Sequence, residues 1–380
     1  MKINVDEKNM PIANIVVAGI TGAGKSTLVN AIFGWEEAAT GTGRAITEHM
    51  DEYHKVGVPV RVWDTVGLEL DSVKTEKSIR DIRKTIEKRA FSKNERECIH
   101  AIWYCINSGS NRYQSAEIKF IKSLHELNVP FIIVLTQCTD DPERIDEFEK
   151  VIRSENEKNG LKGIDIIQVC AKDYKTRLGT IESFGLSDLI HKTTERMPDF
   201  LASSFIAAQN VCRENKRTEC EKIILKYVKQ AMDGFWENIW ILNIPSTSRN
   251  IKMLLGDIAK MYNQILDEDT LNSEIASLSL NSEAIWKGLI SPWSGEYGKR
   301  VQEMFEKKVG NGYEGDFCEL PESAKSARLI AYYGCIFIDS VEETWDWKNE
   351  KKIEEIKAFV RELVKKINKH LAEDKQPMRI

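Results

Sequence analysis

The stretch that most constrains the fold of this chain lies near its start and reads NIVVAGITGAGKST, from Asn14 to Thr27. An apolar run typical of a buried strand leads into a glycine-rich turn, and apolar residues at helical spacing follow. The residues from Gly19 to Ser26 satisfy the pattern G-x-x-x-x-G-K-[ST]. The stretch therefore predicts a strand, a tight turn and a helix that together bind phosphate.

The residues of this loop have distinct parts in holding a nucleotide. Glycines let the backbone curl so that successive N–H groups converge on the phosphates, and the new helix adds the positive end of its dipole. Lys25 is predicted to reach the β and γ phosphates, and the Ser26 hydroxyl to bind Mg2+. The expected nucleotide contacts are the consecutive residues Thr21, Gly22, Ala23, Gly24, Lys25, Ser26 and Thr27.

The composition is that of an ordinary globular protein. Charged residues make up 30% and hydrophobic residues 42% of the 380 residues, a length that favours two domains. The net charge of −5, from 54 basic and 59 acidic side chains, does not indicate a nucleic-acid partner. The apolar runs are too short for a transmembrane segment, and residues 1–10 lack a signal-peptide core. We therefore expect a cytoplasmic protein with reduced cysteines, and peripheral membrane contact stays open.

Strand and helix patterns alternate through the first half of the chain. The expected strands are 15–18, 51–56, 60–63, 100–106, 131–135 and 164–169. The expected helices are 25–34, 74–90, 112–127, 142–158 and 186–196. This alternation predicts an α/β fold with a mostly parallel sheet between two layers of helices. The charged strand 51–56 is expected at the edge of the sheet, antiparallel to 60–63.

The second half of the chain has a helical pattern. Apolar residues at helical spacing predict helices over 201–235, 250–266 and 350–372, whereas 268–325 receives no assignment. We therefore expect three parts, which are an N-terminal tail of residues 1–10, a nucleotide-binding domain of residues 11–200 and an all-α domain of residues 201–380.

Downstream of the glycine-rich loop, the chain offers groups for a metal ion and for a γ-phosphate. The strand 60–63 leads into Asp64-Thr65-Val66-Gly67, a D-x-x-G sequence. Asp64 is predicted to hold Mg2+, directly or through water, and the Gly67 N–H to meet the γ-phosphate. We expect a threonine of the loop 40–47 to bind the same metal, and choose Thr47, with Thr42 as the alternative. The expected metal ligands are thus Ser26, Thr47 and Asp64.

The loops after the strands 131–135 and 164–169 are expected to contact the base. They read Thr136-Gln137-Cys138-Thr139-Asp140 and Cys170-Ala171-Lys172. Both resemble motifs of small GTP-binding domains, [NT]-K-x-D and S-A-K, in which the aspartate accepts hydrogen bonds from guanine. The resemblance implies guanine contacts from Thr136, Gln137, Asp140, Ala171 and Lys172.

With these motifs, residues 11–196 resemble the translation-factor-related class of P-loop GTPases, and within it the Era-like branch. The sequence IWYCIN from Ile102 to Asn107 is similar to the fourth strand of that branch. The resemblance implies a domain that binds GTP and GDP with Mg2+ and hydrolyses GTP. The helical half resembles the C-terminal domain of some bacterial Era-like GTPases.

Three positions differ from patterns of GTP-binding proteins, two in the guanine motif and one, where the Era-like branch usually has a hydrophobic residue, after the D-x-x-G. Gln137 replaces the motif lysine and Thr139 the motif aspartate, so that Asp140 stands one residue late. Either the loop bulges so that Asp140 reaches the base, which we favour, or guanine selectivity is weakened. Leu68 follows the D-x-x-G, where Ras-like proteins carry a water-orienting glutamine. Slow intrinsic turnover is therefore expected.

Arg44 has two interpretations. It precedes Thr47 by three positions, the spacing of the switch arginine in heterotrimeric G-protein α subunits, and a guanidinium there would neutralise charge developing during hydrolysis. The ordinary alternative is a solvated loop residue. With Arg44 included, the residues expected to take part in hydrolysis are Lys25, Arg44, Thr47 and Gly67.

The leading functional interpretation is a regulatory GTPase, a nucleotide-dependent switch that signals through its helical domain to a protein effector or a second copy of itself. The alternatives are an assembly module whose nucleotide is mainly a structural ligand, and an NTPase with relaxed base selectivity.

Overall fold

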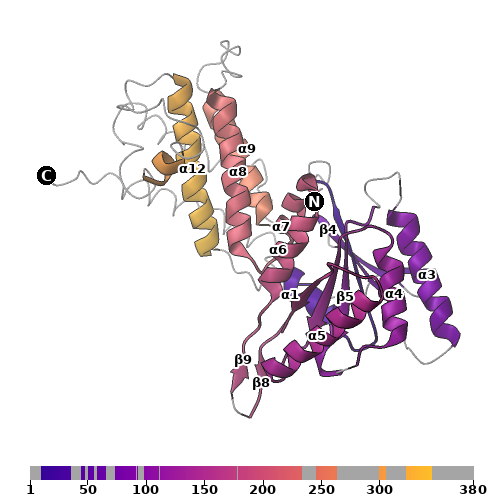
Figure 1. Cartoon of the computed structure of the whole chain (residues 1–380). Helices are drawn as coiled ribbons and strands as arrows, with labels where there is room; N and C mark the ends of the chain where they lie inside the picture. The colour runs from indigo at the N-terminus through magenta and orange to yellow at the C-terminus, as the bar shows by residue number, and fades with distance from the viewer. Residues whose placement is uncertain are drawn as a thin grey trace. The chain divides into compact units, whose positions relative to one another are not determined.

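The computed structural model describes residues 10–35, 44–47, 50–54, 58–65, 73–90, 92, 98–110, 112–177, 179–232, 245–262, 299–304 and 322–344. The chain divides into two compact units, Met1–Arg213 and Glu214–Ile380. The described part of the first unit combines a β-sheet with helices, and the described part of the second is helical (Figure 1).

The first unit is built on a seven-stranded sheet in the order β2-β3-β4-β1-β5-β6-β7. The strands are β1 (Ala13–Gly19), β2 (Arg44–Thr47), β3 (Met50–His54), β4 (Val60–Thr65), β5 (Ala101–Asn107), β6 (Phe131–Thr136) and β7 (Asp165–Gln168). Neighbouring strands from β4 to β7 are parallel, whereas β3 is antiparallel to β4 and β2 to β3. The predicted mostly parallel α/β sheet is confirmed.

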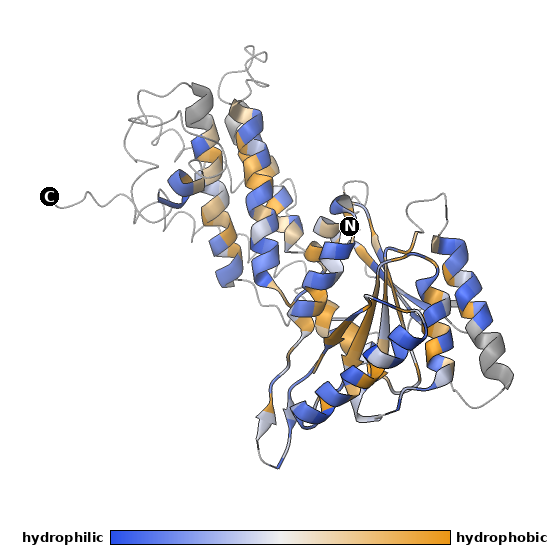
Figure 2. Cartoon of the chain, viewed as in Figure 1, coloured by the Kyte–Doolittle hydropathy of each residue, from blue (hydrophilic) through white to orange (hydrophobic). Residues whose placement is uncertain are grey.

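Helices cover both faces of this sheet (Figure 1). One face packs against α1 (Lys25–Phe33), α6 (Leu186–Arg196) and α7 (Asp199–Ala208). The other packs against α3 (Val73–Ala90), α4 (Ser115–His125) and α5 (Pro142–Lys158). The central strands are apolar along their length, and the helices carry polar and apolar residues on opposite sides (Figure 2). This pattern is expected where a parallel sheet is buried on both faces.

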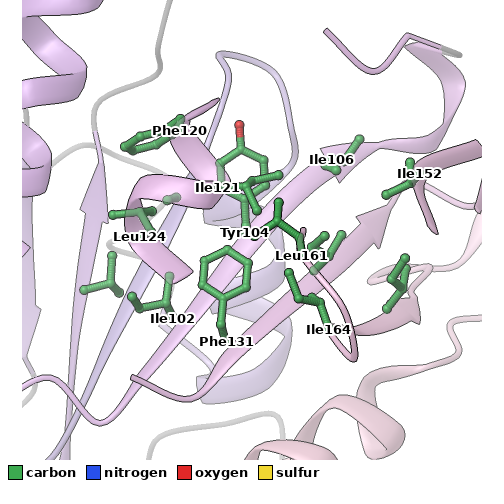
Figure 3. Close-up of a cluster of buried hydrophobic side chains, with 14 of the residues drawn as sticks. Ile102, Tyr104, Ile106, Phe120, Ile121, Leu124, Phe131, Ile152, Leu161 and Ile164 are labelled. Atoms are coloured by element: carbon green, nitrogen blue, oxygen red, sulfur yellow. The ribbon is translucent and has the colours of Figure 1, made fainter. Parts of the chain in front are cut away.

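Aliphatic side chains and three aromatic rings pack together in the core between β5, β6 and α4 (Figure 3). Tyr104 of β5 lies with its ring centroid 6.5 Å from that of Phe131 on β6 and 5.9 Å from that of Phe120 on α4. All three are buried, and full burial of one such side chain contributes roughly 2–3 kcal/mol. This core packs β5 and β6 against α4, and the parallel pairing of β5 with β1 brings the ends of the three strands together.

The structure corrects two predictions about the first strands. Residues 44–47 form β2, so the assignment of Arg44 and Thr47 to a loop is wrong. Their backbone pairs with β3, with Arg44 opposite Glu52 and Thr47 opposite Met50. Since β3 pairs with β2 on one side and β4 on the other, it is not the edge strand that its charge suggested. Its antiparallel pairing with β4 is confirmed.

A small hairpin and a helix complete the first unit. β8 (Tyr174–Lys175) and β9 (Thr180–Ile181) form a two-stranded sheet after β7 and project from the main sheet (Figure 1). The helix α7 packs on the sheet through Phe205, whose ring centroid lies 6.1 Å from that of Trp103 and 6.2 Å from that of Phe33. The first unit therefore extends beyond residue 200, where the sequence-based boundary was drawn.

The segment after α7 is tied to the end of α1. The Asn210 backbone N–H donates to the Ile32 carbonyl at 2.8 Å, and its side-chain amide donates to the Phe33 carbonyl at 3.2 Å. Gln209 is fully buried, and its side-chain oxygen accepts the N–H groups of the two residues after Asn210 at 2.7 Å each. The two Asn210 bonds satisfy carbonyls in the last turn of α1, and the two bonds to Gln209 hold the turn on either side of Asn210.

The helix α8 (Arg213–Met232) belongs to the second unit except for Arg213, the last residue of the first unit. The second unit also contains α9 (Pro245–Met261), helical residues 299–304 and α12 (Glu322–Thr344). Gly334 lets α12 approach α8 closely, since a Cβ there would lie 2.6 Å from Ile224 Cγ1. Arg217 of α8 pairs with Asp339 and, at 2.8 Å, with Glu342 on α12. No helix in the described ranges is long and apolar enough to span a bilayer.

The helical predictions for this half are only partly matched. The segment 201–235 is two helices, α7 and α8, because the turn at Gln209 separates them. The helix expected at 250–266 corresponds to α9, and the one expected at 350–372 lies outside the described residues. The sequence did not predict α12.

Candidate nucleotide-binding site

The turn between β1 and α1 brings the glycine-rich loop to the carboxyl end of the central strand. Gly19 is the last residue of β1 and lies opposite Cys105 of β5. A Cβ on Gly19 would lie 2.4 Å from the Cys105 carbonyl oxygen, so only glycine fits there. Gly24 caps α1 with a left-handed backbone, φ 78°. The loop backbone thereby curls over the start of the helix, where unpaired N–H groups and the helix dipole favour an anion.

Lys25 is held inside this loop. Its amino group donates to the Gly19 carbonyl at 3.1 Å and to the Ile20 carbonyl at 3.2 Å, and only 8% of the residue is exposed. Both acceptors are weaker partners for an ammonium group than a phosphate oxygen would be. The cation is therefore positioned at the place where an anion would bind.

Asp64 lies near the end of β4, the strand beside β1. The register pairs it with Val17 of β1, and the Ser26 hydroxyl donates a hydrogen bond to its carboxylate. Burial raises the pKa of Asp64 to about 6, although the charge of Lys25 acts in the opposite direction. Lys25, Ser26 and Asp64 are thus brought together at this end of the sheet.

The chemistry of these side chains fits a magnesium ion. The Asp64 Oδ1 atom is buried and has no hydrogen-bond partner within the described residues, an arrangement that costs free energy unless a cation or its water occupies the position. Mg2+ prefers oxygen ligands and is usually bound by one or two carboxylates together with substrate phosphates. Ser26 and Asp64 would hold it at this end of the sheet.

The end of β6 is fastened to the same loop. The Thr136 hydroxyl donates to the Ala23 carbonyl at 2.6 Å, and the Gln137 side-chain amide donates to the Gly22 carbonyl at 2.9 Å. Gln137 has a left-handed backbone, φ 54°, which is uncommon for a residue other than glycine. Its carbonyl accepts the Ser108 hydroxyl at 2.9 Å, which helps to hold this conformation.

Comparison with known proteins finds a family match over the part of the chain that contains this loop, β4 and β6. Residues 14–137, from β1 to the residue after β6, match the family model described as 50S ribosome-binding GTPase. This match agrees with the strand order and with the loop geometry of the first unit. The first unit has the fold of a P-loop GTPase. A search of curated proteins finds no match to the chain.

Solved structures similar to this chain include the following three. A probable GTP-binding protein EngB is 18% identical, with 48% of this chain and 97% of that one covered and a TM-score of 0.33. Era from Aquifex aeolicus is 14% identical, with 50% and 58% covered and a TM-score of 0.32. The elongation factor SelB from Methanococcus maripaludis is 17% identical, with 50% and 35% covered and a TM-score of 0.32.

The two loops expected to contact the guanine base lie next to each other. The Cys138 N–H donates to the Val169 carbonyl at 3.2 Å, which joins the loop after β6 to the loop after β7. Ala171 is half-buried and Lys172 is exposed. Asp140 is exposed, and its Oδ1 accepts the N–H of the next residue at 2.8 Å. The guanine contacts of these residues stay predictions.

Some of the predicted residues lie outside the described residues, and others are placed by their backbone alone. Gly67, Leu68 and the alternative Thr42 lie outside the described residues. Arg44 and Thr47 stand at the two ends of β2, and their parts in metal binding and hydrolysis stay predictions.

Sequence reasoning missed Asp51. The register places it directly opposite Asp64 in the antiparallel pair β3–β4, so both side chains point to the same face of the sheet. The antiparallel pairing was predicted, but counting back from the predicted turn at 57–59 places Glu52 opposite Asp64, so only the observed register identifies Asp51.

Proposed function

We propose that this protein binds GTP and GDP through its first unit, hydrolyses GTP with Mg2+ and acts as a nucleotide-dependent switch. The observation that carries the proposal is the loop from Gly19 to Ser26, with the Lys25 amino group bonded to two backbone carbonyls and Ser26 bonded to Asp64. A cation, helix-end N–H groups and a carboxylate with one unpartnered oxygen form a site suited to Mg2+ and a polyphosphate.

In the proposed reaction a water attacks the γ-phosphorus, the β–γ bridge bond breaks, and GDP and inorganic phosphate leave. Lys25 would neutralise charge on the β and γ oxygens, and the Gly67 N–H would bind a γ oxygen. When bound, Mg2+ would stabilise the negative charge on the same oxygens. Thr47 and Asp64 are the candidates to hold the metal with Ser26, and Arg44 is a candidate for a second cation.

The neutral Gln137 and the displaced Asp140 are the positions on which guanine selectivity depends. We propose that Thr136 and Gln137 support the loop, while Asp140, Ala171 and Lys172 contact the base. The contact of Gln137 with the Gly22 carbonyl supports the first part. The helical second unit would pass the nucleotide state to a protein effector or to a second copy of the chain, in the cytoplasm.

Nucleotide extraction and turnover test this proposal. Purified protein is expected to carry GDP, and to release phosphate slowly from GTP but not from ATP in the presence of Mg2+. The matched variants are Lys25→Ala, which removes the buried amino group, and Lys162→Ala, which removes an exposed lysine and should change neither property. Equal turnover of ATP and GTP would support the base-relaxed alternative. Bound nucleotide that is never hydrolysed would contradict the switch and support a structural ligand.

The effector part of the proposal needs a separate experiment. Protein loaded with a non-hydrolysable GTP analogue and protein loaded with GDP are compared for the partners they capture and for their oligomeric state. A difference between the two forms is expected. Identical partners and identical oligomeric states would contradict a switch.

A further inference from the structure

Two carboxylates face each other at the candidate metal site. Asp51 and Asp64 are directly opposite in the β3–β4 ladder, where Cβ atoms lie about 5 Å apart. The negative charge of Asp51 acts on Asp64 and also on Tyr53, two residues further along the same face of β3. Like charges in this arrangement destabilise a sheet, so a protein that contains them is expected to have a cation for the pair.

The described basic side chains do not neutralise the negative charge of Asp51. Within the described ranges, no basic side chain forms an ion pair with it. The neighbouring Glu52, on the opposite face of β3, has such a partner, since its carboxylate lies 2.9 Å from Arg61. The positive charge of Lys25 lowers the pKa of Asp64, against the effect of burial. The Lys25 amino group is bonded to the loop carbonyls, however, and would turn to a phosphate group when a nucleotide binds.

We propose that Asp51 is a positioning residue of the magnesium site, which strengthens Mg2+ binding through its charge and as an acceptor for metal-bound water. This inference rests on the proposed function. Mg2+ usually keeps several waters, and a second carboxylate on the same face provides an acceptor for one of them. One negative charge about 6 Å from a divalent ion, in a water-like dielectric, changes its affinity roughly tenfold.

Two isosteric substitutions on adjacent residues of β3 test the proposal. Asp51→Asn removes the charge on the metal side, and Glu52→Gln removes the same charge on the other face. The first measurement is the Mg2+ concentration that gives half of the maximal gain in GDP affinity, with Mn2+ binding followed by EPR as a direct readout of the metal. Asp51→Asn should need about ten times more Mg2+ than wild type, and Glu52→Gln the wild-type concentration.

The second measurement is stability in EDTA without nucleotide. Asp51→Asn should unfold at a higher urea concentration than wild type because the repulsion with Asp64 is gone. Glu52→Gln should unfold at a lower one because the ion pair between Glu52 and Arg61 is lost. Asp51→Ser provides a second variant that also removes the charge. A positioning role predicts both effects, whereas a merely structural role for Asp51 would leave the Mg2+ requirement unchanged.

The outcomes separate the two proposals. A wild-type protein that binds neither GDP nor GTP in millimolar Mg2+ would overturn the proposed function and this inference with it. A wild type that binds GDP with Mg2+, beside an Asp51→Asn protein with the same Mg2+ requirement, would overturn this inference alone. Equal shifts in Asp51→Asn and Glu52→Gln would also overturn it, because they would show a general effect of net charge.

Discussion

Asp64→Asn is expected to stabilise the metal-free protein while removing its response to Mg2+. The folded state holds the Asp64 pKa at about 6, above the ordinary value of 3.8, chiefly because of burial. That difference corresponds to roughly 3 kcal/mol at neutral pH, by which the charged carboxylate opposes folding. Asparagine has almost the same shape without the charge and can still accept the hydrogen bond from Ser26. We expect a gain of about 1–3 kcal/mol, with the upper value set by the pKa difference.

The sign of the effect follows from the direction of the pKa change. Between pH 4 and 6 the folded state binds more protons at Asp64 than the unfolded state, so the contribution of this residue to stability falls as pH rises through that window. Above pH 6 the contribution stays constant. The stability difference between Asp64→Asn and wild type should therefore be near zero at pH 4 and largest at pH 7.

Urea denaturation in EDTA, at pH 4, 5, 6 and 7, measures this difference. The same series with Mg2+ and GDP should show a large gain for wild type and little for Asp64→Asn, because the carboxylate is lost. Glu52→Gln, which removes an acid from the other face of the neighbouring strand, is the matched control and should lack this pH profile. An Asp64→Asn protein that is less stable than wild type at pH 7, or whose advantage does not depend on pH, would refute the reasoning.

Three further substitutions test the loop and its attachments. Gly19→Ala should lower the urea midpoint by the equivalent of roughly 2 kcal/mol and abolish GDP binding, since its Cβ would meet the Cys105 carbonyl oxygen; normal calorimetric GDP binding would contradict this. Gln137→Ala removes one hydrogen bond to the Gly22 carbonyl and should weaken GDP binding about fivefold, as read by fluorescent-nucleotide titration, with unchanged affinity as the contrary result. Asn210→Ala should destabilise the first unit by about 1 kcal/mol in urea denaturation, whereas no loss would show that its side-chain bond to α1 contributes nothing.

The local parts of the site could be predicted because their chemistry lies within a few consecutive residues. The residues from Gly19 to Ser26 carry their own turn, helix start and cation, and the structure places them as expected at the end of β1. Asp64 lies near the end of β4, within the D-x-x-G sequence that predicted its part. The alternation of strands and helices also sufficed for the α/β fold, because each element shows its own periodicity.

The parts that depend on pairing between distant segments were harder to predict. β2 has four residues, which is too short for a clear alternation, and only its ladder with β3 defines it as a strand. Asp51 became a site residue only through the register of β3 against β4. The contacts of Gln137 and Thr136 with the loop join residues more than a hundred positions apart, which no local pattern specifies.

The missed helix α12 has a different physical cause. Residues 327–338 are all buried and Arg328 is the one charged residue among them, so this part of α12 lacks the polar side that would leave a single apolar stripe. A helix of that kind lacks the 3.6-residue periodicity by which helices are found in a sequence, and a short apolar run is equally compatible with a strand. Its burial comes from packing against α9 and α8 within the second unit.

The bonds between Asn210 and the end of α1 determine where the first unit can be cut. A fragment that stopped at residue 200 would keep every strand of the sheet, yet it would lose Phe205 from its place beside Trp103 and leave the Ile32 and Phe33 carbonyls without these donors. The helix that begins at the phosphate loop would then end in a frayed last turn. A fragment for nucleotide-binding measurements should therefore run to Arg213, because the residues that complete the phosphate-loop helix come from the far end of the unit.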